Sequence, residues 1–155
     1  MTHLADDRMT LLGVLDGYTD AINHRDWARL QALFVADASW QTLNHNLFAF
    51  RGAAEIANGL RAIIEGTEML FQTRGATIVH IDGDSARMRS SMQEAGRMRD
   101  GTSFFAFGSY SDVMVREGSG WCFVERSWTT LYWEDNTMNG RSFPVPERID
   151  WPAQY

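Results

Sequence analysis

The sequence predicts an α+β fold in which three helices cover one curved antiparallel sheet. Two observations support this prediction. Hydrophobic residues recur at helical spacing in three segments of the first half, and after residue 66 the pattern changes to alternation. Glycine-containing turns then divide the second half into long segments, which indicates an antiparallel meander. A sheet that buries its face against only three helices has to curve, and the resulting cone is a common place for a ligand cavity.

The three helices are expected at about residues 4 to 22, directly after Asp26, and at about residues 53 to 65. The first has one apolar stripe, formed by Leu4, Leu11, Leu15, Tyr18 and Ile22. Asp26 is a suitable N-cap for the second, whose apolar face is Trp27, Leu30 and Phe34. Gly66 is expected to end the third. Because Tyr18 belongs to the buried stripe, its hydroxyl needs a partner, either in the core or in a site.

The turn signals also divide the expected strands. A short pair is expected at residues 38–43 and 47–50, joined by an Asn-His-Asn turn. Four longer strands follow, at 69–81 with an interruption at Gly75, 85–94, 102–116 and 121–133. Residues 134–155 hold all three prolines (Pro144, Pro146 and Pro152) and are expected to form an extended tail. We therefore predict one domain over 1–155, with its core in 1–133.

Composition limits the function classes. The net charge of -6 and the absence of a Lys/Arg-rich run argue against nucleic acid or an anionic membrane as partner. No apolar run approaches the roughly 18 residues of a membrane span, and the polar N-terminus does not resemble a signal peptide. The single cysteine, Cys122, suits a reducing cytoplasm and is interpreted as a core thiol. We expect a cytoplasmic protein.

The four histidines do not predict a metal site. None of them is spaced from another as metal ligands are, so neither a metal nor another cofactor is expected. His24 and His45 lie in predicted turns and are interpreted as exposed, and His80 is expected on the outer face of the sheet.

Four segments together give the chain a family resemblance: YTDAINHRDWARLQALFVADASW, IDGDSARMRSSM, GSYSDVMVREGSGW and WCFVERSWTTLYW. The chain resembles the SnoaL-like branch of the nuclear transport factor 2-like superfamily. That branch includes scytalone dehydratase, bile-acid 7α-dehydratase, hexachlorocyclohexane dehydrochlorinase and polyketide cyclases. The resemblance implies a cone-shaped α+β fold and a cofactor-free elimination. In such members a histidine–aspartate pair transfers the proton, and tyrosine or arginine holds the oxygen.

Position by position, the resemblance keeps the tyrosine but not the proton-transfer pair. The tyrosine of the first helix corresponds to Tyr18, and the acid five residues later corresponds to Asn23. The histidine corresponds to Gln72, with Arg74 as an alternative residue entering the cavity there. A second acid corresponds to Glu94. The arginine that some members carry in the last strand corresponds to Thr130.

Glu94 is therefore the candidate general base. Alternation places it on one strand face together with Met88, Ser90 and Met92. In an apolar cavity, loss of hydration would raise the pKa of its carboxyl and make it a better base near neutrality. The alternative is a structural ion pair with Arg97 or Arg99.

Aromatic residues are abundant enough to enclose a flat, apolar ligand. The expected ligand contacts are Trp40, Met92, Phe107, Trp128, Thr130 and Tyr132. A purely structural aromatic core explains the same residues.

The leading hypothesis is a lyase or isomerase acting on an aromatic, polyketide-like or steroid-like small molecule. In it Tyr18 donates to an oxyanion, Asn23 orients Tyr18, and Gln72 or Arg74 polarises an oxygen. Two alternatives remain: a non-catalytic binding domain for a hydrophobic metabolite, and a small assembly subunit like that of ring-hydroxylating dioxygenases. Family analogy suggests a homodimer or higher homo-oligomer.

Overall fold

The computed structural model describes residues 2–135 and 137–144. Its elements in chain order are α1 (Thr2–His24), α2 (Trp27–Ala32), β1 (Phe34–Thr42), β2 (Ala49–Arg51), α3 (Ala53–Glu65), β3 (Thr67–Asp82), β4 (Ser85–Met98), β5 (Ser103–Glu117) and β6 (Gly120–Asp135). The predicted α+β class is confirmed. The predicted third helix has the bounds that the structure shows.

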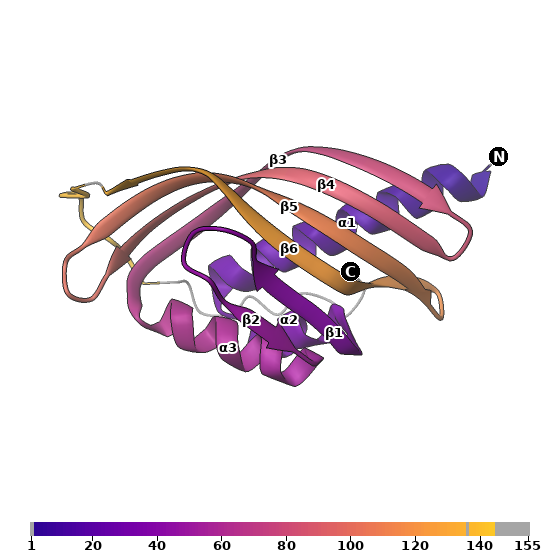
Figure 1. The fold of residues 1–155 in the computed structure, drawn as a ribbon, viewed down its shortest axis with the longest axis horizontal. Helices are drawn as coiled ribbons and strands as arrows, with labels where there is room; N and C mark the ends of the chain where they lie inside the picture. Colours follow the sequence, from indigo (N-terminus) through magenta and orange to yellow (C-terminus); the bar gives the residue numbers. More distant parts are fainter. Residues whose placement is uncertain (1, 136, 145–155) are drawn as a thin grey trace.

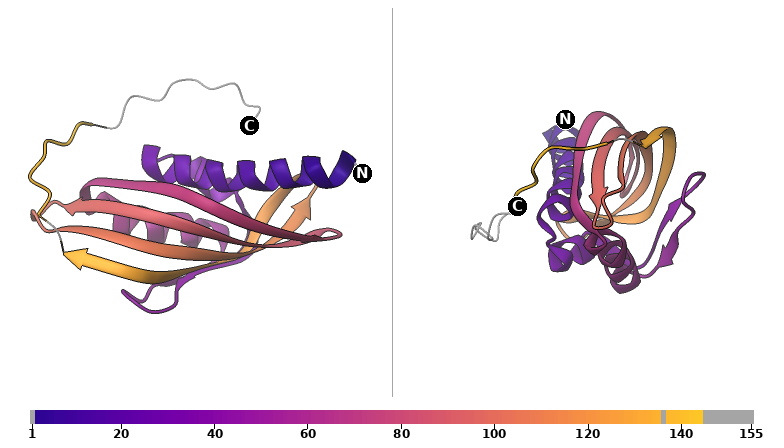
Figure 2. Two further views of the ribbon diagram at one scale, coloured as in Figure 1. Left: turned by 90° about the horizontal axis from the view of Figure 1, so that it is seen from above. Right: turned by 90° about the vertical axis from the view of Figure 1, so that its left-hand side faces the viewer.

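All six strands belong to one curved, open sheet with the order β2-β1-β6-β5-β4-β3. Neighbouring strands are antiparallel except for β1 and β6, which run parallel. Figures 1 and 2 show the long strands β3 to β6 arching over the helices, with α1 lying along β3 and α3 beside β1. The helices therefore cover the concave face of the sheet.

Local chemistry explains where the second helix begins and ends. The carboxylate of Asp26 accepts a hydrogen bond from the Arg29 backbone N–H at 3.1 Å, as predicted for an N-cap. The helix ends at Ala32 with Leu33 as its C-cap, so Phe34 begins β1 and does not belong to the apolar face of the helix as expected. Gly66 does cap α3, but with a right-handed φ of -69°, so glycine is not required there for a left-handed turn.

The pairing of the long strands shifts register at four places, two of which concern the site. In β3 the pairing with β4 shifts between Arg74 and Thr77, around the glycine where an interruption was expected. In β6 another shift leaves Leu131 unpaired, because Phe107 pairs with Tyr132 while Gly108 pairs with Thr130. An extra residue of this kind is a β-bulge, and it reverses the faces to which the following side chains point.

The core contains a fully buried ion pair among aromatic rings. Arg126 Nη1 donates to Asp112 Oδ2 at 2.8 Å, and neither side chain is exposed. The guanidinium carbon of Arg126 lies 4.1 Å, 3.6 Å and 4.7 Å from the ring centroids of Tyr18, Tyr110 and Phe123. These cation–π contacts help to fix the positions of the two tyrosine rings.

Part of the expected tail lies within the described residues. Residues 137–144 contain no helix or strand, and Arg97 binds them through the Met138 and Gly140 carbonyl oxygens, each at 2.7 Å. Arg97 also pairs with Glu68 of β3. Pro146 and Pro152, two of the three prolines on which the tail prediction rested, lie outside the described residues.

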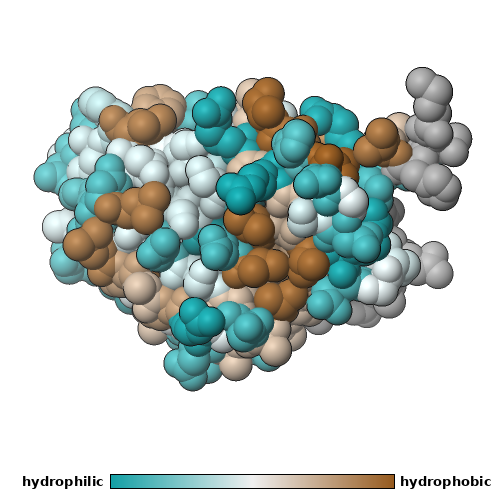
Figure 3. All heavy atoms as spheres, turned by 45° about the vertical axis from the view of Figure 1, so that its right-hand side comes forward, coloured by the Kyte–Doolittle hydropathy of each residue, from teal (hydrophilic) through white to brown (hydrophobic). Residues whose placement is uncertain are grey.

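The surface carries scattered apolar side chains. On the face shown in Figure 3, apolar groups are separated by hydrophilic ones. Large exposed apolar residues include Phe71, Ile78, Phe107, Leu131 and Tyr132. Among the described residues, no helix is both long and apolar enough to span a membrane.

Candidate functional site

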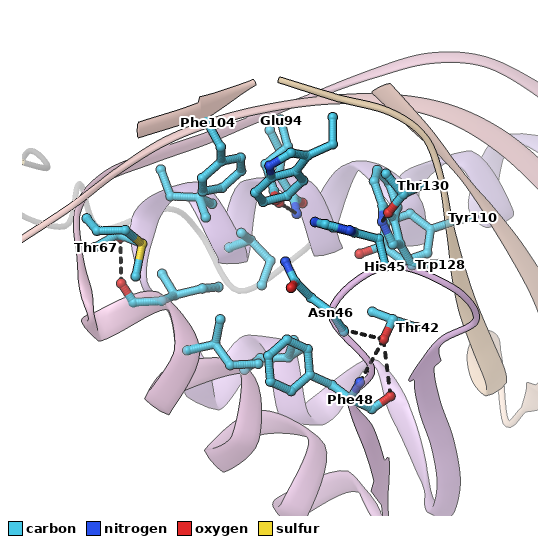
Figure 4. A pocket seen from close by; sticks show the side chains of 18 of the residues that line it. Thr42, His45, Asn46, Phe48, Thr67, Glu94, Phe104, Tyr110, Trp128 and Thr130 are labelled. Carbon is cyan, nitrogen blue, oxygen red and sulfur yellow. Dashed lines mark hydrogen bonds between the residues drawn. The ribbon is translucent and has the colours of Figure 1, made fainter. Parts of the chain in front are cut away.

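A cavity of about 400 Å³ lies between the inner face of the sheet, α1, α3 and the β1–β2 loop (residues 43–48). Figure 4 shows side chains from β4, β5, β6 and this loop directed into the same space. Its inner end is formed by buried residues, among them Tyr18, Trp40 and Gln72. Its outer end is formed by exposed ones, including His45 and Asp135. The cavity predicted beneath a curved sheet is therefore present.

Glu94 and Gln72 form the acidic corner of the cavity. They are cross-strand neighbours on β4 and β3, and Gln72 Nε2 donates to Glu94 Oε2 at 2.6 Å. Burial raises the pKa of the Glu94 carboxyl above its ordinary 4.5, and the Gln72 hydrogen bond opposes that rise only in part. The alternative ion pairs are not formed, because Arg97 binds Glu68 and the Arg99 Nε donates to the Glu65 carbonyl.

Asn23 acts on the site through Gln72. Its Oδ1 accepts from the Gln72 backbone N–H at 2.8 Å, and its Nδ2 donates to the Gln72 carbonyl at 2.9 Å. The side chain thus ties the end of α1 to β3 and does not line the cavity. This corrects the expectation that Asn23 orients Tyr18 directly: it fixes the strand that carries the partner of Glu94.

Two tyrosine hydroxyls lie at the inner end of the cavity. Trp40 Nε1 donates to the Tyr18 hydroxyl at 3.1 Å, and the hydroxyls of Tyr18 and Tyr110 are 3.4 Å apart. Burial raises the pKa of both phenols, and the nearby Glu94 carboxylate adds to the rise. Both hydroxyls are therefore protonated at neutral pH. Tyr18 accepts from Trp40, and either hydroxyl can donate to the other, so one of the two phenol protons remains available for donation into the cavity.

Three expected site residues lie elsewhere. Arg74 Nε donates to Asp16 Oδ1 at 3.0 Å on the side of α1, and its side chain does not enter the cavity. Met92 is buried in the core without lining the cavity. Phe107 points to the outer face of the sheet, where it is 40% exposed.

The bulge at Leu131 decides which residues of β6 contact the cavity. Trp128 and Thr130 precede it and line the cavity as expected. Gly108 leaves room for the Trp128 ring, since a Cβ there would come within 2.1 Å of it. Tyr132 follows the bulge and is 48% exposed on the outer face, whereas Trp133 turns inward. The expectation that Tyr132 contacts a ligand together with Trp128 and Thr130 is corrected for this reason.

His45 is exposed, as the sequence interpretation expected, but it also lines the outer end of the cavity. It belongs to the β1–β2 loop, and its ring centroid lies 4.5 Å from that of Trp133. Asn44 anchors the loop, because its side chain accepts from the Thr130 N–H at 2.9 Å and donates to the Thr130 carbonyl at 2.7 Å. Only the doubled asparagine in Asn-His-Asn hinted at such an anchored loop.

Two further sets of residues had not been foreseen. The cavity is also lined by Tyr110 and Phe104 of β5 and by Asp135 at the end of β6.

In the described parts of the chain, no three His, Cys, Asp or Glu side chains are grouped as metal ligands. Cys122 does not line the cavity, and burial raises the pKa of its thiol.

Comparison with known proteins agrees with this architecture. A family model described as a SnoaL-like domain matches residues 4–127, which is most of the chain. The chain belongs to the SnoaL-like family. This confirms the resemblance, and the domain is a member of the nuclear transport factor 2-like superfamily. No curated protein matches the chain significantly.

Solved structures share the fold of this SnoaL-like domain at low sequence identity. The hexachlorocyclohexane dehydrochlorinase LinA-type3 of Novosphingobium barchaimii is 14% identical, with a TM-score of 0.79 over 92% of this chain and 97% of its own. A proposed scytalone dehydratase of Novosphingobium aromaticivorans is 19% identical, with a TM-score of 0.77 over 96% and 98%. A proposed aromatic ring hydroxylase of the latter species is 20% identical, with a TM-score of 0.79 over 85% and 94%.

The raised pKa of Glu94 has a consequence for stability. The folded state holds the Glu94 proton more tightly than the unfolded chain, so the free energy of unfolding falls as the pH rises from about 4.5 through the folded-state pKa. Glutamine has no such proton. We expect Glu94→Gln to raise the melting temperature more at alkaline than at acid pH. Thermal unfolding of both proteins across this range checks it, and a pH-independent difference would contradict the raised pKa.

Proposed function

We propose that this SnoaL-like domain is a cofactor-independent lyase or isomerase that removes a proton next to a carbonyl group of a small ring compound. The observation that carries the proposal is the Glu94 carboxyl, which has a raised pKa and opens into a largely apolar cavity beside two tyrosine hydroxyls. A carboxylate in such surroundings is a stronger base than one in water. The names of two similar structures, a dehydrochlorinase and a proposed dehydratase, support elimination chemistry.

The first step is proton abstraction by Glu94. The C–H bond breaks, the proton passes to the carboxylate, and the electron pair moves to the carbonyl oxygen as an enolate. The hydrogen bond from Gln72 Nε2 holds the carboxylate in place, and Asn23 holds the backbone of Gln72. Fixing the base in this way lowers the entropy cost of reaching the transition state.

The hydroxyls of Tyr18 and Tyr110 stabilise the enolate oxygen. The two hydroxyls are adjacent and Tyr18 also accepts from Trp40, so one of the two phenol protons is free for donation to the oxyanion. Hydrogen-bond donors already in position are the usual means of stabilising a developing oxyanion. The enolate then either expels a leaving group from the neighbouring carbon, which is a lyase reaction, or takes the Glu94 proton at another carbon, which is an isomerisation.

The ring compound would lie against Trp40 of β1 and against Trp128 and Thr130 of β6, which line the cavity. Aromatic and polyketide-like or steroid-like molecules suit these flat apolar walls. Arg74 has no part in this proposal because it is paired with Asp16 outside the cavity.

Exchange of the α-protons of β-tetralone, a bicyclic aromatic ketone, tests the function without knowledge of the leaving group. Dissolved in deuterium oxide with the protein, β-tetralone should gain deuterium at its activated CH₂ group faster than in buffer alone. Proton NMR measures the rate directly. If the ketone binds and exchange stays at the buffer rate, the domain is a binding protein and the proposed function is wrong.

A further inference from the structure

The cavity has an imbalance of charge that the proposed function does not use. Glu94 and Asp135 are among its lining residues, and no lysine or arginine is present in the described part of that lining. Two arginines near the cavity are engaged elsewhere: Arg97 with Glu68 and the tail, and Arg126 with Asp112 behind the tyrosine rings. Within the described residues, therefore, no positive side chain pairs with Glu94.

The acidic corner also has more acceptors than donors. Glu94 Oε2 accepts from Gln72, and Gln72 Oε1 is buried with no hydrogen-bond partner among the described residues. That oxygen has almost no accessible surface, so neither water nor a ligand reaches it in this conformation. Among the described residues the Glu94 carboxylate has Gln72 Nε2 as its one hydrogen-bond donor, which favours a ligand that brings further N–H or O–H groups to this corner.

The walls around that corner are aromatic. Trp40, Tyr110, Trp128 and Trp133 line the cavity, and the Trp133 ring is stacked on Phe104 with centroids 4.5 Å apart. The faces of such rings carry partial negative charge and attract cations, most strongly where water is excluded. The aromatic walls and the acidic corner thus both favour a positively charged ligand.

We propose that the cavity binds a protonated amine carried on an apolar ring system, with the Glu94 carboxylate accepting its N–H groups. The inference rests on the proposed function in taking the cavity as the substrate site, and it narrows the substrate to basic amines. An ammonium group paired with Glu94 would lower the pKa of the carboxyl and keep it ionised, which reduces its strength as a base, while the same positive charge would stabilise a carbanion formed beside it. Anionic substrates such as carboxylates are excluded by the same charges.

Three β-substituted naphthalenes of nearly equal size separate charge from shape: naphthylmethylammonium, naphthalenemethanol and naphthoate. Calorimetric titration at mildly alkaline pH measures their dissociation constants for the wild-type protein. We expect the ammonium compound to bind about tenfold more tightly than the alcohol, and naphthoate to bind most weakly. The alcohol binding as tightly as the ammonium compound, or no binding of the ammonium compound, would overturn the proposal.

Two variants locate the counter-ion. Glu94→Gln keeps the shape of the side chain and should remove most of the preference of the wild-type protein for the ammonium compound over the alcohol. The matched control is Asp135→Asn at the outer end of the cavity, which should keep that preference. A preference that survives Glu94→Gln and is lost in Asp135→Asn would overturn the assignment of Glu94. Binding is measured without turnover, so the binding result does not depend on whether deuterium exchange into β-tetralone is observed.

Discussion

Replacing Glu94 with glutamine is expected to slow deuterium exchange into β-tetralone by about 10²–10⁴-fold, the usual contribution of a positioned general base. Glutamine fills nearly the same volume and can still hydrogen-bond to Gln72, but its amide has no basic oxygen strong enough to take the proton. The tyrosines and the apolar walls stay in place, so binding of the ketone should change much less than the exchange rate.

A matched acid variant excludes a general effect of lost charge. Asp16→Asn removes a carboxylate that lies on α1 and pairs with Arg74 outside the cavity, and it should exchange at the wild-type rate. Proton NMR of all three proteins gives the rates, and thermal unfolding shows that each is folded. Exchange by Glu94→Gln within about threefold of wild type would remove Glu94 as the base.

Replacing Asp112 with leucine is expected to lower the free energy of unfolding by about 3–5 kcal/mol, because Arg126 would remain buried and charged without its partner. Burial raises the pKa of Asp112 to about 6 although Arg126 opposes this, so the pair is ionised at neutral pH. Arg126 Nε and Nη2 already lack hydrogen-bond partners in the described chain, which leaves no alternative acceptor for the guanidinium. Urea denaturation measures the loss.

Two further variants isolate the cause. A double variant, Asp112→Leu with Arg126→Met, should recover much of the stability, because neither charge then remains buried. Asp84→Ala breaks an ion pair with Arg116 in which Asp84 is 81% exposed, and it should cost at most about 1 kcal/mol. A single Asp112→Leu variant no less stable than Asp84→Ala would show that the buried pair does not stabilise the fold.

Much of the fold could be predicted because its signals are local. Asp26 caps a helix through a side chain three residues from its donor, and α3 lies where helical spacing placed it. The inward face of β4 also follows from alternation, since Met88, Ser90 and Met92 are all buried. Because Glu94 continues this face in an uninterrupted part of the strand, its place in the cavity could be predicted as well.

The rest of the site could not be predicted, because it depends on contacts between distant segments. Arg74 pairs with Asp16 because α1 crosses β3 at that point, and Tyr18 meets Tyr110 across 92 residues. Arg126 was not singled out, since nothing in WCFVERSWTTLYW indicates that its partner is Asp112 on the neighbouring strand.

The sequence by itself determined the α+β class, the order of the elements, the family and the inward direction of Glu94. These follow from spacing along the chain, which composition and periodicity express directly. Only the tertiary structure decided the lining of the cavity. One unpaired residue at Leu131 exchanges Tyr132 for Trp133, and the anchored β1–β2 loop places His45 at the outer end of the cavity. Register shifts and loop placement are settled by pairing with other strands, so a linear pattern does not record them.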